Sequence, residues 1–172
     1  DASVHMEYAK EPRRLPQTAL TNTEMKKILN SPNTHTLTGY RDRTLLELLY
    51  STGIRKSELI HLKLEDVDYT EGYLRVNCGK GQKDRVTPIG KIACQYLETY
   101  IKGIRPLLNF KKEANVLFLS QRSRELGKST LDELIKKHAR KSGLDKPVST
   151  HTFRRSCATE MIKNKANLMH VK

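Results

Sequence analysis

Apolar side chains recur at three- and four-residue spacing over most of this chain, a pattern that predicts helices. Helices are expected at residues 21–30, 40–52, 56–62, 90–102, 129–142 and 150–163. The first opens with Thr21 and Glu24, the spacing of a capping box. Gly53, Gly103 and Gly143 are expected to end three of the others, because glycine readily takes the left-handed conformation that closes a helix.

The spacing changes to short alternating runs between residues 67 and 89. Turn sequences at 70–72 and 79–84 divide this region into three short strands, which predicts a small antiparallel sheet. A later apolar run at 116–119 is either a strand or a buried extended piece. The predicted fold class is therefore mainly α with a small three-stranded antiparallel β-sheet, an α+β fold.

The leucines at 45, 46, 48 and 49 make the helix at 40–52 the expected centre of the core. Ser129 or Thr130 is the expected cap of the helix at 129–142, and the Ser149-Thr150 pair is expected to cap the helix at 150–163. These residues are polar and directly precede apolar periodic segments, which is typical of helix starts.

The 172 residues divide into a short polar lead and one domain. Residues 1–20 are predicted to be a tag remnant and a linker or arm, because 1–6 resemble an expression remnant and 7–20 are polar with two prolines. Residues 21–172 form the domain. No run of 18 apolar residues occurs, so no membrane span or membrane partner is expected.

Cys78, Cys94 and Cys157 are far apart and lack metal or redox spacing. They are interpreted as buried or half-buried free thiols. Free thiols fit a reducing compartment, and no secretory signal is visible, so a cytoplasmic location is expected.

Charge changes this picture most, because 32 Lys and Arg face 19 Asp and Glu and give a net charge of +13. A positive field of this size attracts polyanions, which favours nucleic acid as the partner. The alternative at this point is a ribosomal-type or simply soluble basic protein.

The sequence T-G-I-R-K-S-E-L at 52–59 joins two predicted helices. The turn at Gly53 projects Arg55 from a rigid base, and Glu58 is close enough along the chain to reach back and orient the guanidinium. The alternative interpretation is an ordinary exposed arginine at a helix start, where a cation is mildly disfavoured by the helix dipole.

The second motif, G-K-G-Q-K-D-R at 79–85, is a predicted hairpin tip that carries Lys80, Lys83 and Arg85. Glycines let its backbone approach a ligand closely, so these cations are candidates for contact with DNA. A charged hairpin that simply faces solvent is the alternative. The motif is not a P-loop, because the required glycine and lysine spacing is absent.

The third motif, H-T-F-R at 151–154, places His151 and Arg154 on one face of a helix. A guanidinium fork beside a titratable imidazole suits a phosphate, although a solvated basic face is the alternative. Arg155 adds charge beside the pair. No cluster of carboxylates or of Cys and His suits a metal, so no metal cofactor is expected. Side chains alone would then neutralise a reacting phosphate, and a Tyr hydroxyl would serve as nucleophile.

The three motifs, in this order, resemble the boxes of the tyrosine recombinase (phage integrase) family's catalytic domain, over residues 15–172. The resemblance implies that domain's fold. It also implies that Arg55, Lys80, His151 and Arg154 surround the scissile phosphate of double-stranded DNA. Glu58 matches the acidic residue that supports the first arginine.

The same resemblance implies metal-free strand exchange by a tetramer on DNA, through a 3′-phosphotyrosine and a free 5′-hydroxyl. The family's later His and its nucleophilic Tyr would follow Lys172, where this sequence stops in a helix expected to begin at Leu168. All seven tyrosines precede His151, and none matches the nucleophile. The chain is therefore predicted to be a catalytic domain lacking its C-terminal helices, unable to cleave DNA by itself.

Three other functions remain open from the sequence. A non-catalytic, sequence-tolerant DNA-binding module would use the same basic face for phosphate contacts alone. A type IB topoisomerase-like enzyme would share the tyrosine chemistry without paired specific sites. A metal-dependent nuclease is disfavoured because a carboxylate cluster is missing.

Overall fold

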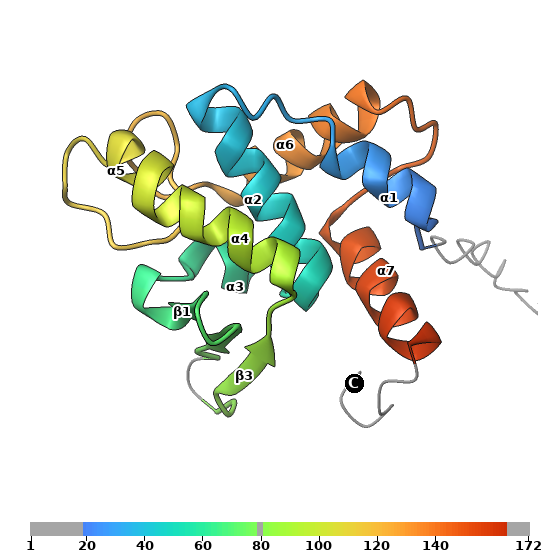
Figure 1. Cartoon of the computed structure of the whole chain (residues 1–172), viewed down its shortest axis with the longest axis horizontal. Helices are drawn as coiled ribbons and strands as arrows, with labels where there is room; N and C mark the ends of the chain where they lie inside the picture. The colour runs from blue at the N-terminus through green and yellow to red at the C-terminus, as the bar shows by residue number, and fades with distance from the viewer. Residues whose placement is uncertain (1–18, 79–80, 165–172) are drawn as a thin grey trace, which may run out of the picture.

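The computed structural model describes residues 19–78 and 81–164, which form a helical domain with one small sheet at its edge (Figure 1). Its elements are α1 Asn22–Leu29, α2 Leu37–Thr52, α3 Lys56–His61, the 3₁₀ turn η1 Leu64–Asp66, β1 Val67–Asp68, β2 Tyr73–Val76, β3 Arg85–Pro88, α4 Lys91–Thr99, the π-helical turn η2 Tyr100–Ile104, α5 Arg105–Leu108, α6 Lys128–Lys141 and α7 Thr150–Lys163. The predicted fold class is confirmed within these residues. Residues 1–18 and the helix expected from Leu168 lie outside the described residues.

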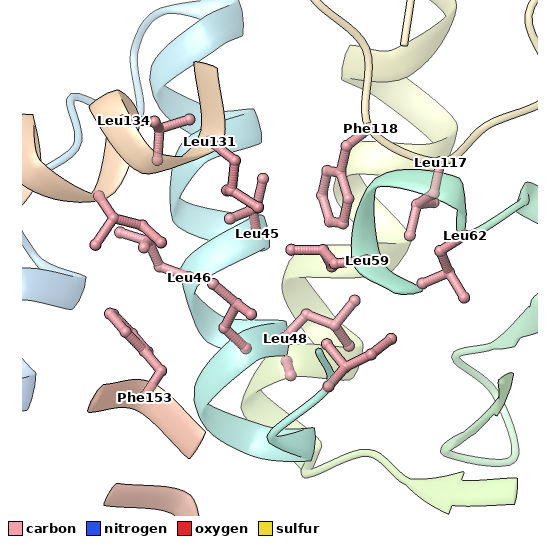
Figure 2. Packing of buried hydrophobic residues seen from close by; sticks show 14 of the residues in the cluster. Leu45, Leu46, Leu48, Leu59, Leu62, Leu117, Phe118, Leu131, Leu134 and Phe153 are labelled. Atoms are coloured by element: carbon pink, nitrogen blue, oxygen red, sulfur yellow. The ribbon is translucent and has the colours of Figure 1, made fainter. Parts of the chain in front are cut away.

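The helix α2 lies at the centre of the core, as its leucine content predicts. It packs against α1, α4, α5 and α7. Four of its leucines are fully buried: Leu45, Leu46, Leu48 and Leu49. These positions cover more than one face of a helix, so α2 needs apolar partners on several sides. Figure 2 shows its leucines between α6 and Phe153 of α7 on one side and Phe118 with Leu59 of α3 on the other.

The sheet is antiparallel with the order β1-β2-β3, as predicted. Leu74 and Val76 of β2 point into the core, whereas Val86 of the edge strand β3 is 63% exposed. Val76 pairs with Arg85, and this pair is the last one of the β2–β3 ladder before the hairpin tip that joins the two strands. The register therefore decides where the side chain of Arg85 leaves the hairpin.

The chain enters the described core at Leu20, directly before α1. Its side chain is buried, and its backbone N–H donates to Ser156 Oγ of α7 at 2.9 Å. Thr21 and Glu24 form the predicted capping box at the start of α1. These contacts hold α1 beside α7, the helix that carries His151 and Arg154.

The prediction that a helix ends at Gly103 is wrong. The chain continues from α4 through the π turn η2 into α5, which ends at Leu108. Tyr100 is fully buried and donates its hydroxyl to Leu117 O at 2.9 Å, and Arg105 donates to the Val116 carbonyl at 2.7 Å. These two contacts from residues on either side of the glycine hold the helical turns against the extended segment at 116–119.

That extended segment is the buried piece that the sequence left as one of two options. Leu117, Phe118 and Leu119 are all buried, and the segment joins its neighbours through isolated bridges. Tyr100 stacks on Phe118 with ring centroids 5.4 Å apart. The segment binds both α2 and the η2 turn, because Arg41 Nη1 donates to Leu119 O at 2.9 Å and the Tyr100 hydroxyl donates to Leu117 O at 2.9 Å.

The predicted cap of the helix at 129–142 is also wrong. The helix α6 begins at Lys128, and its N-cap is Gly127 in an extended conformation. Leu126 before the cap and Leu131 four residues into the helix are both buried. These are the two positions of a hydrophobic staple, so burial of apolar residues sets the start of α6 instead of a hydroxyl cap.

A buried polar group fixes α6 on α2. His138 of α6 contacts Asp42 with Nε2 and Oδ2 2.9 Å apart, and its Nδ1 lies 3.0 Å from Ser31 Oγ. Arg41 donates to Asp42 Oδ1 from Nη2 at 2.7 Å and to Leu119 O from Nη1 at 2.9 Å. Each of these buried polar side chains has a partner, as a stable core requires.

Cys78 and Cys94 are half-buried and Cys157 is buried, and all three are free, as the sequence predicts. Among the described residues, no helix has both the length and the apolar character needed to cross a membrane.

Candidate phosphate-binding site

The turn at Gly53 connects α2 to α3 and sets the position of Arg55. Gly53 has φ 60° and ψ 25°, and its N–H donates to Leu49 O at 2.9 Å, which closes α2. This left-handed conformation favours glycine. The next residue, Ile54, is buried, and it anchors the turn to the core. Arg55 then points outward with 57% of its side chain exposed, so a cation stands on a rigid base.

Glu58 lies between two arginines. It accepts the backbone N–H of Arg55 at 2.9 Å and the Arg55 Nη1 at 3.2 Å, the contact that the spacing predicts. It also accepts both terminal nitrogens of Arg85, Nη1 on Oε1 and Nη2 on Oε2, each at 2.8 Å. The shorter, two-armed contact is therefore with Arg85, although the spacing in sequence pointed only to Arg55.

The two arginines set the charge state of Glu58. Partial burial raises the pKa of this carboxyl. Hydrogen bonds from Arg85 and from the Arg55 N–H outweigh that effect and lower the pKa from an ordinary 4.5 to about 2. Glu58 therefore remains an anion at any pH at which DNA is duplex. A fixed negative charge here offsets part of the repulsion between the neighbouring guanidinium groups.

Glu58 is expected to add stability that disappears in acid. Its pKa is depressed in the folded state, so the contribution is complete above about pH 4.5 and is lost as the pH falls towards 2. Arg55, Arg85 and Arg154 face it and keep their charge throughout. After allowance for solvent screening, we expect Glu58→Gln to cost about 1–2 kcal/mol at pH 6 and little at pH 2.5. Urea unfolding at a series of pH values measures this.

The control for this prediction is Glu133→Gln. Glu133 is 68% exposed and lies 3.7 Å from Lys136 in an exposed pair. Its replacement should change the free energy of unfolding by little at every pH. A cost of Glu58→Gln that stays constant from pH 6 to pH 2.5 would contradict the assignment.

The helix α7 has the bounds that the sequence predicts, and its N-cap is Ser149. The Ser149 N–H donates to Thr152 Oγ1 at 3.0 Å, which completes the first turn. Phe153 is fully buried and orients the helix, while His151 is exposed at its start. Arg154, one turn later, is half-buried.

The Arg154 side chain contacts the same turn that presents Arg55. Its Nη1 donates to Gly53 O, and the position of a Gly53 Cβ would lie 3.8 Å from the Arg154 Cα. Burial and the nearby Arg55 charge lower the pKa of the Arg154 guanidinium, while Glu58 opposes that shift. The two arginines are 99 positions apart in sequence (154 − 55), and one glycine turn brings them together.

The structure describes all of the other predicted site residues except Lys80. Arg85 contacts Glu58, and Lys83 is exposed on the hairpin. His151 and Arg155 are exposed on α7 beside Arg154. Lys80 lies outside the described residues.

One positioning contact was missed from the sequence. Lys56, next to Arg55, binds both carboxylate oxygens of Asp132 in α6, at 2.8 and 3.0 Å. This pair fixes the start of α3 to α6. The partners are 76 positions apart in sequence, so no local signal predicts the contact, because side-chain pairs can be predicted only at helical or strand spacing.

Within residues 19–78 and 81–164, no group of three or more His, Cys, Asp or Glu side chains is placed to hold a metal ion. The charges near the Gly53 turn are instead guanidinium groups around one carboxylate. Guanidinium forks bind phosphate oxygens with two donors each, so this arrangement suits a phosphodiester.

The mostly helical domain with its three-stranded antiparallel sheet has the fold of a tyrosine recombinase catalytic core. The chain belongs to the phage integrase family, whose sequence profile matches residues 18–172.

The relatives agree with this assignment. Tyrosine recombinase XerD from Staphylococcus saprophyticus is 43% identical over 171 residues, which are 99% of this chain and 57% of that protein. XerD from Staphylococcus aureus is 42% identical over the same share. The chain thus spans a little over half the length of the curated relatives it matches.

Solved structures share the fold. The XerA recombinase crystal structure superposes with a TM-score of 0.80 at 27% identity, over 93% of this chain and 56% of that one. The lambda integrase catalytic core gives a TM-score of 0.67 at 21% identity, over 90% of both chains. XerH bound to difH substrate, in a pre-cleavage complex, gives 0.73 at 23% identity over 99% of this chain and 50% of that one.

Proposed function

We propose that this chain is the catalytic domain of a site-specific DNA recombinase, in which Arg55 and Arg154 hold the scissile phosphate. The observation that carries the proposal is the contact between Arg154 and the Gly53 carbonyl, two residues before Arg55. This contact holds the Arg154 guanidinium beside the turn that presents Arg55. Two related structures, XerH bound to difH substrate and the Tn1549 transposon integrase in complex with circular intermediate DNA, support a DNA ligand here.

In the whole protein, a tyrosine hydroxyl attacks the phosphorus and forms a 3′-phosphotyrosine, while the 5′-oxygen leaves with a proton. The two guanidinium groups stabilise the charge that develops on the non-bridging oxygens. Lys80 and His151 are assigned to proton transfer at the attacking and leaving oxygens. A hydroxyl of another strand reverses the step, so no metal and no external energy source is needed.

The proposal also covers the assembly and the location. Recombination between two duplex sites requires two cleaving subunits at each site, which gives a tetramer on DNA. The protein would act in the cytoplasm, where its DNA substrate lies.

We expect the 172-residue chain to bind duplex DNA with strong dependence on salt. If about four phosphates are contacted, the affinity should fall about 100-fold between 50 and 200 mM salt, because condensed counterions are released on binding. Fluorescence anisotropy with a labelled duplex over a salt series measures the slope. An affinity that does not change with salt would contradict a phosphate-binding face.

The same chain is expected not to cleave DNA. All seven tyrosines precede His151 in the sequence. Among the described ones, Tyr100 is buried with its hydroxyl on Leu117 O, and the rings of Tyr40 and Tyr96 pack together 5.5 Å apart. A nicked suicide duplex should therefore yield no covalent adduct with this chain, but should yield one with the whole protein. A covalent band from the 172 residues would refute this expectation.

A further inference from the structure

Arg85 is the first residue of β3, directly after the basic hairpin, and the sequence suggests that it contacts DNA. In the structure its guanidinium faces α3 instead. Nη1 and Nη2 each bind one oxygen of Glu58 at 2.8 Å, and Nη1 also lies 3.3 Å from Cys78 Sγ. The two-pronged side of the guanidinium, which would best match a phosphate, is therefore occupied within the protein.

Arg55 shares the same carboxylate in a weaker way. Its Nη1 lies 3.2 Å from Glu58 Oε1, and 57% of its side chain is exposed, compared with 37% for Arg85 and 11% for Glu58. Most of the donors of Arg55 thus stay available to a ligand. If Arg85 were absent, both oxygens of Glu58 would lack their main partner, and Arg55 would be the nearest cation to replace it.

If Arg55 replaced Arg85 on Glu58, the site would lose the guanidinium that binds the phosphate. A partly buried carboxylate strongly favours a two-armed guanidinium contact over a single long one. Arg55 would turn towards Glu58 and away from solvent, so the protein would lose a phosphate clamp although the residue itself is intact.

We propose that Arg85 is a positioning residue for Arg55: its fork occupies Glu58 and so leaves the Arg55 guanidinium available to the scissile phosphate. The inference rests on the proposed function of Arg55. It differs from a DNA-contact role for Arg85 in one respect that can be measured. A positioning role predicts a loss in the cleavage rate through Arg55, whereas a DNA-contact role predicts a loss in DNA affinity and in its salt slope.

The test is Arg85→Lys in the whole protein, because lysine keeps the charge and loses the fork. At saturating DNA, the single-turnover cleavage rate should fall about tenfold, as expected for a lost charged hydrogen-bond pair. The dissociation constant and its salt slope should stay within about twofold, because the charge is retained. Cleavage at the parent rate by a folded Arg85→Lys protein would overturn the proposal.

Two further variants sharpen the result. Arg75→Lys, at an exposed position of the neighbouring strand β2, makes the same chemical change and should leave the rate and the affinity unchanged. Arg85→Lys combined with Glu58→Gln should be no slower than the slower single variant, since both act through one contact. Losses that multiply would show that Arg85 acts independently of Glu58, and would overturn the proposal.

Failure of this inference can be told apart from failure of the proposed function. If Arg55→Ala leaves cleavage intact, the proposed phosphate site is wrong. If Arg55→Ala abolishes cleavage while Arg85→Lys does not change it, only the role of Arg85 is wrong. Should Arg85→Lys not fold, NMR of the parent chain with a short duplex decides: the Arg55 guanidinium signal should shift strongly and the Arg85 signal weakly, and the reverse would overturn the proposal.

Discussion

Replacing Arg55 or Arg154 by Ala in the whole protein is expected to lower the strand-cleavage rate by about 10²–10³-fold, while DNA affinity falls less than about tenfold. Preorganised donors aimed at a transition-state oxygen contribute about 2.7–4 kcal/mol each, far more than one of several phosphate contacts contributes to binding. Single-turnover cleavage of a suicide duplex gives the rate, and anisotropy gives the affinity.

The matched control is Lys102→Ala. Lys102 is an exposed cation that pairs with Glu98 at 2.6 Å, on the π turn beyond α4. Its loss changes the net charge by the same amount and should leave the cleavage rate unchanged. Equal losses of cleavage and binding for Arg55→Ala and Arg154→Ala would favour the non-catalytic DNA-binding module that the sequence left open.

The second large effect is expected for Phe153→Ala, which should lower the free energy of unfolding by about 3–5 kcal/mol. Phe153 is fully buried and lies between His151 and Arg154 in sequence. Figure 2 shows its ring directed towards α2. Truncation leaves a cavity at the contact that holds α7 on the core. A domain of this kind is typically stable by only about 5–15 kcal/mol, so much of its stability would be lost. Urea unfolding of the 172-residue chain measures the change.

Two variants bracket this result. Phe153→Leu keeps an apolar side chain at the same place, so it should cost clearly less than the alanine variant. Ile162→Ala lies on the same helix, but Ile162 is 50% exposed, so its loss should cost under about 1 kcal/mol. A Phe153→Ala cost as small as that of Ile162→Ala would mean that α7 is held mainly by its polar contacts to Leu20 and to the Gly53 turn.

The sequence is sufficient where the cause of a structure is local. The capping box at Thr21 and Glu24 and the bounds of α7 follow from residues within one turn of each other. The central place of α2 follows from leucines at consecutive helical positions. The contact between Arg55 and Glu58 belongs to the same class, because three residues on a helix start span one turn.

Local reasoning failed where a distant segment changed the outcome. Gly103 is a sound stop signal by itself, but Tyr100 and Arg105 on either side of it bind an extended segment and carry the helix past it. The predicted start of α6 was wrong for a similar reason. Burial of Leu126, directly before the Gly127 cap, outweighed the capping preference of Ser129 and Thr130. In both places a tertiary contact outweighed a propensity worth about 1 kcal/mol.

For the candidate site, the sequence by itself determined which cations the motifs hold and that a glycine turn presents Arg55. Only the tertiary structure decided which of those cations has its donors available. The β2–β3 register aims Arg85 at Glu58, and packing of α7 on α2 brings Arg154 to the Gly53 carbonyl. A guanidinium binds whichever carboxylate or carbonyl lies within about 3 Å of its nitrogens, and that distance is set by the packing of the elements and not by spacing along the chain.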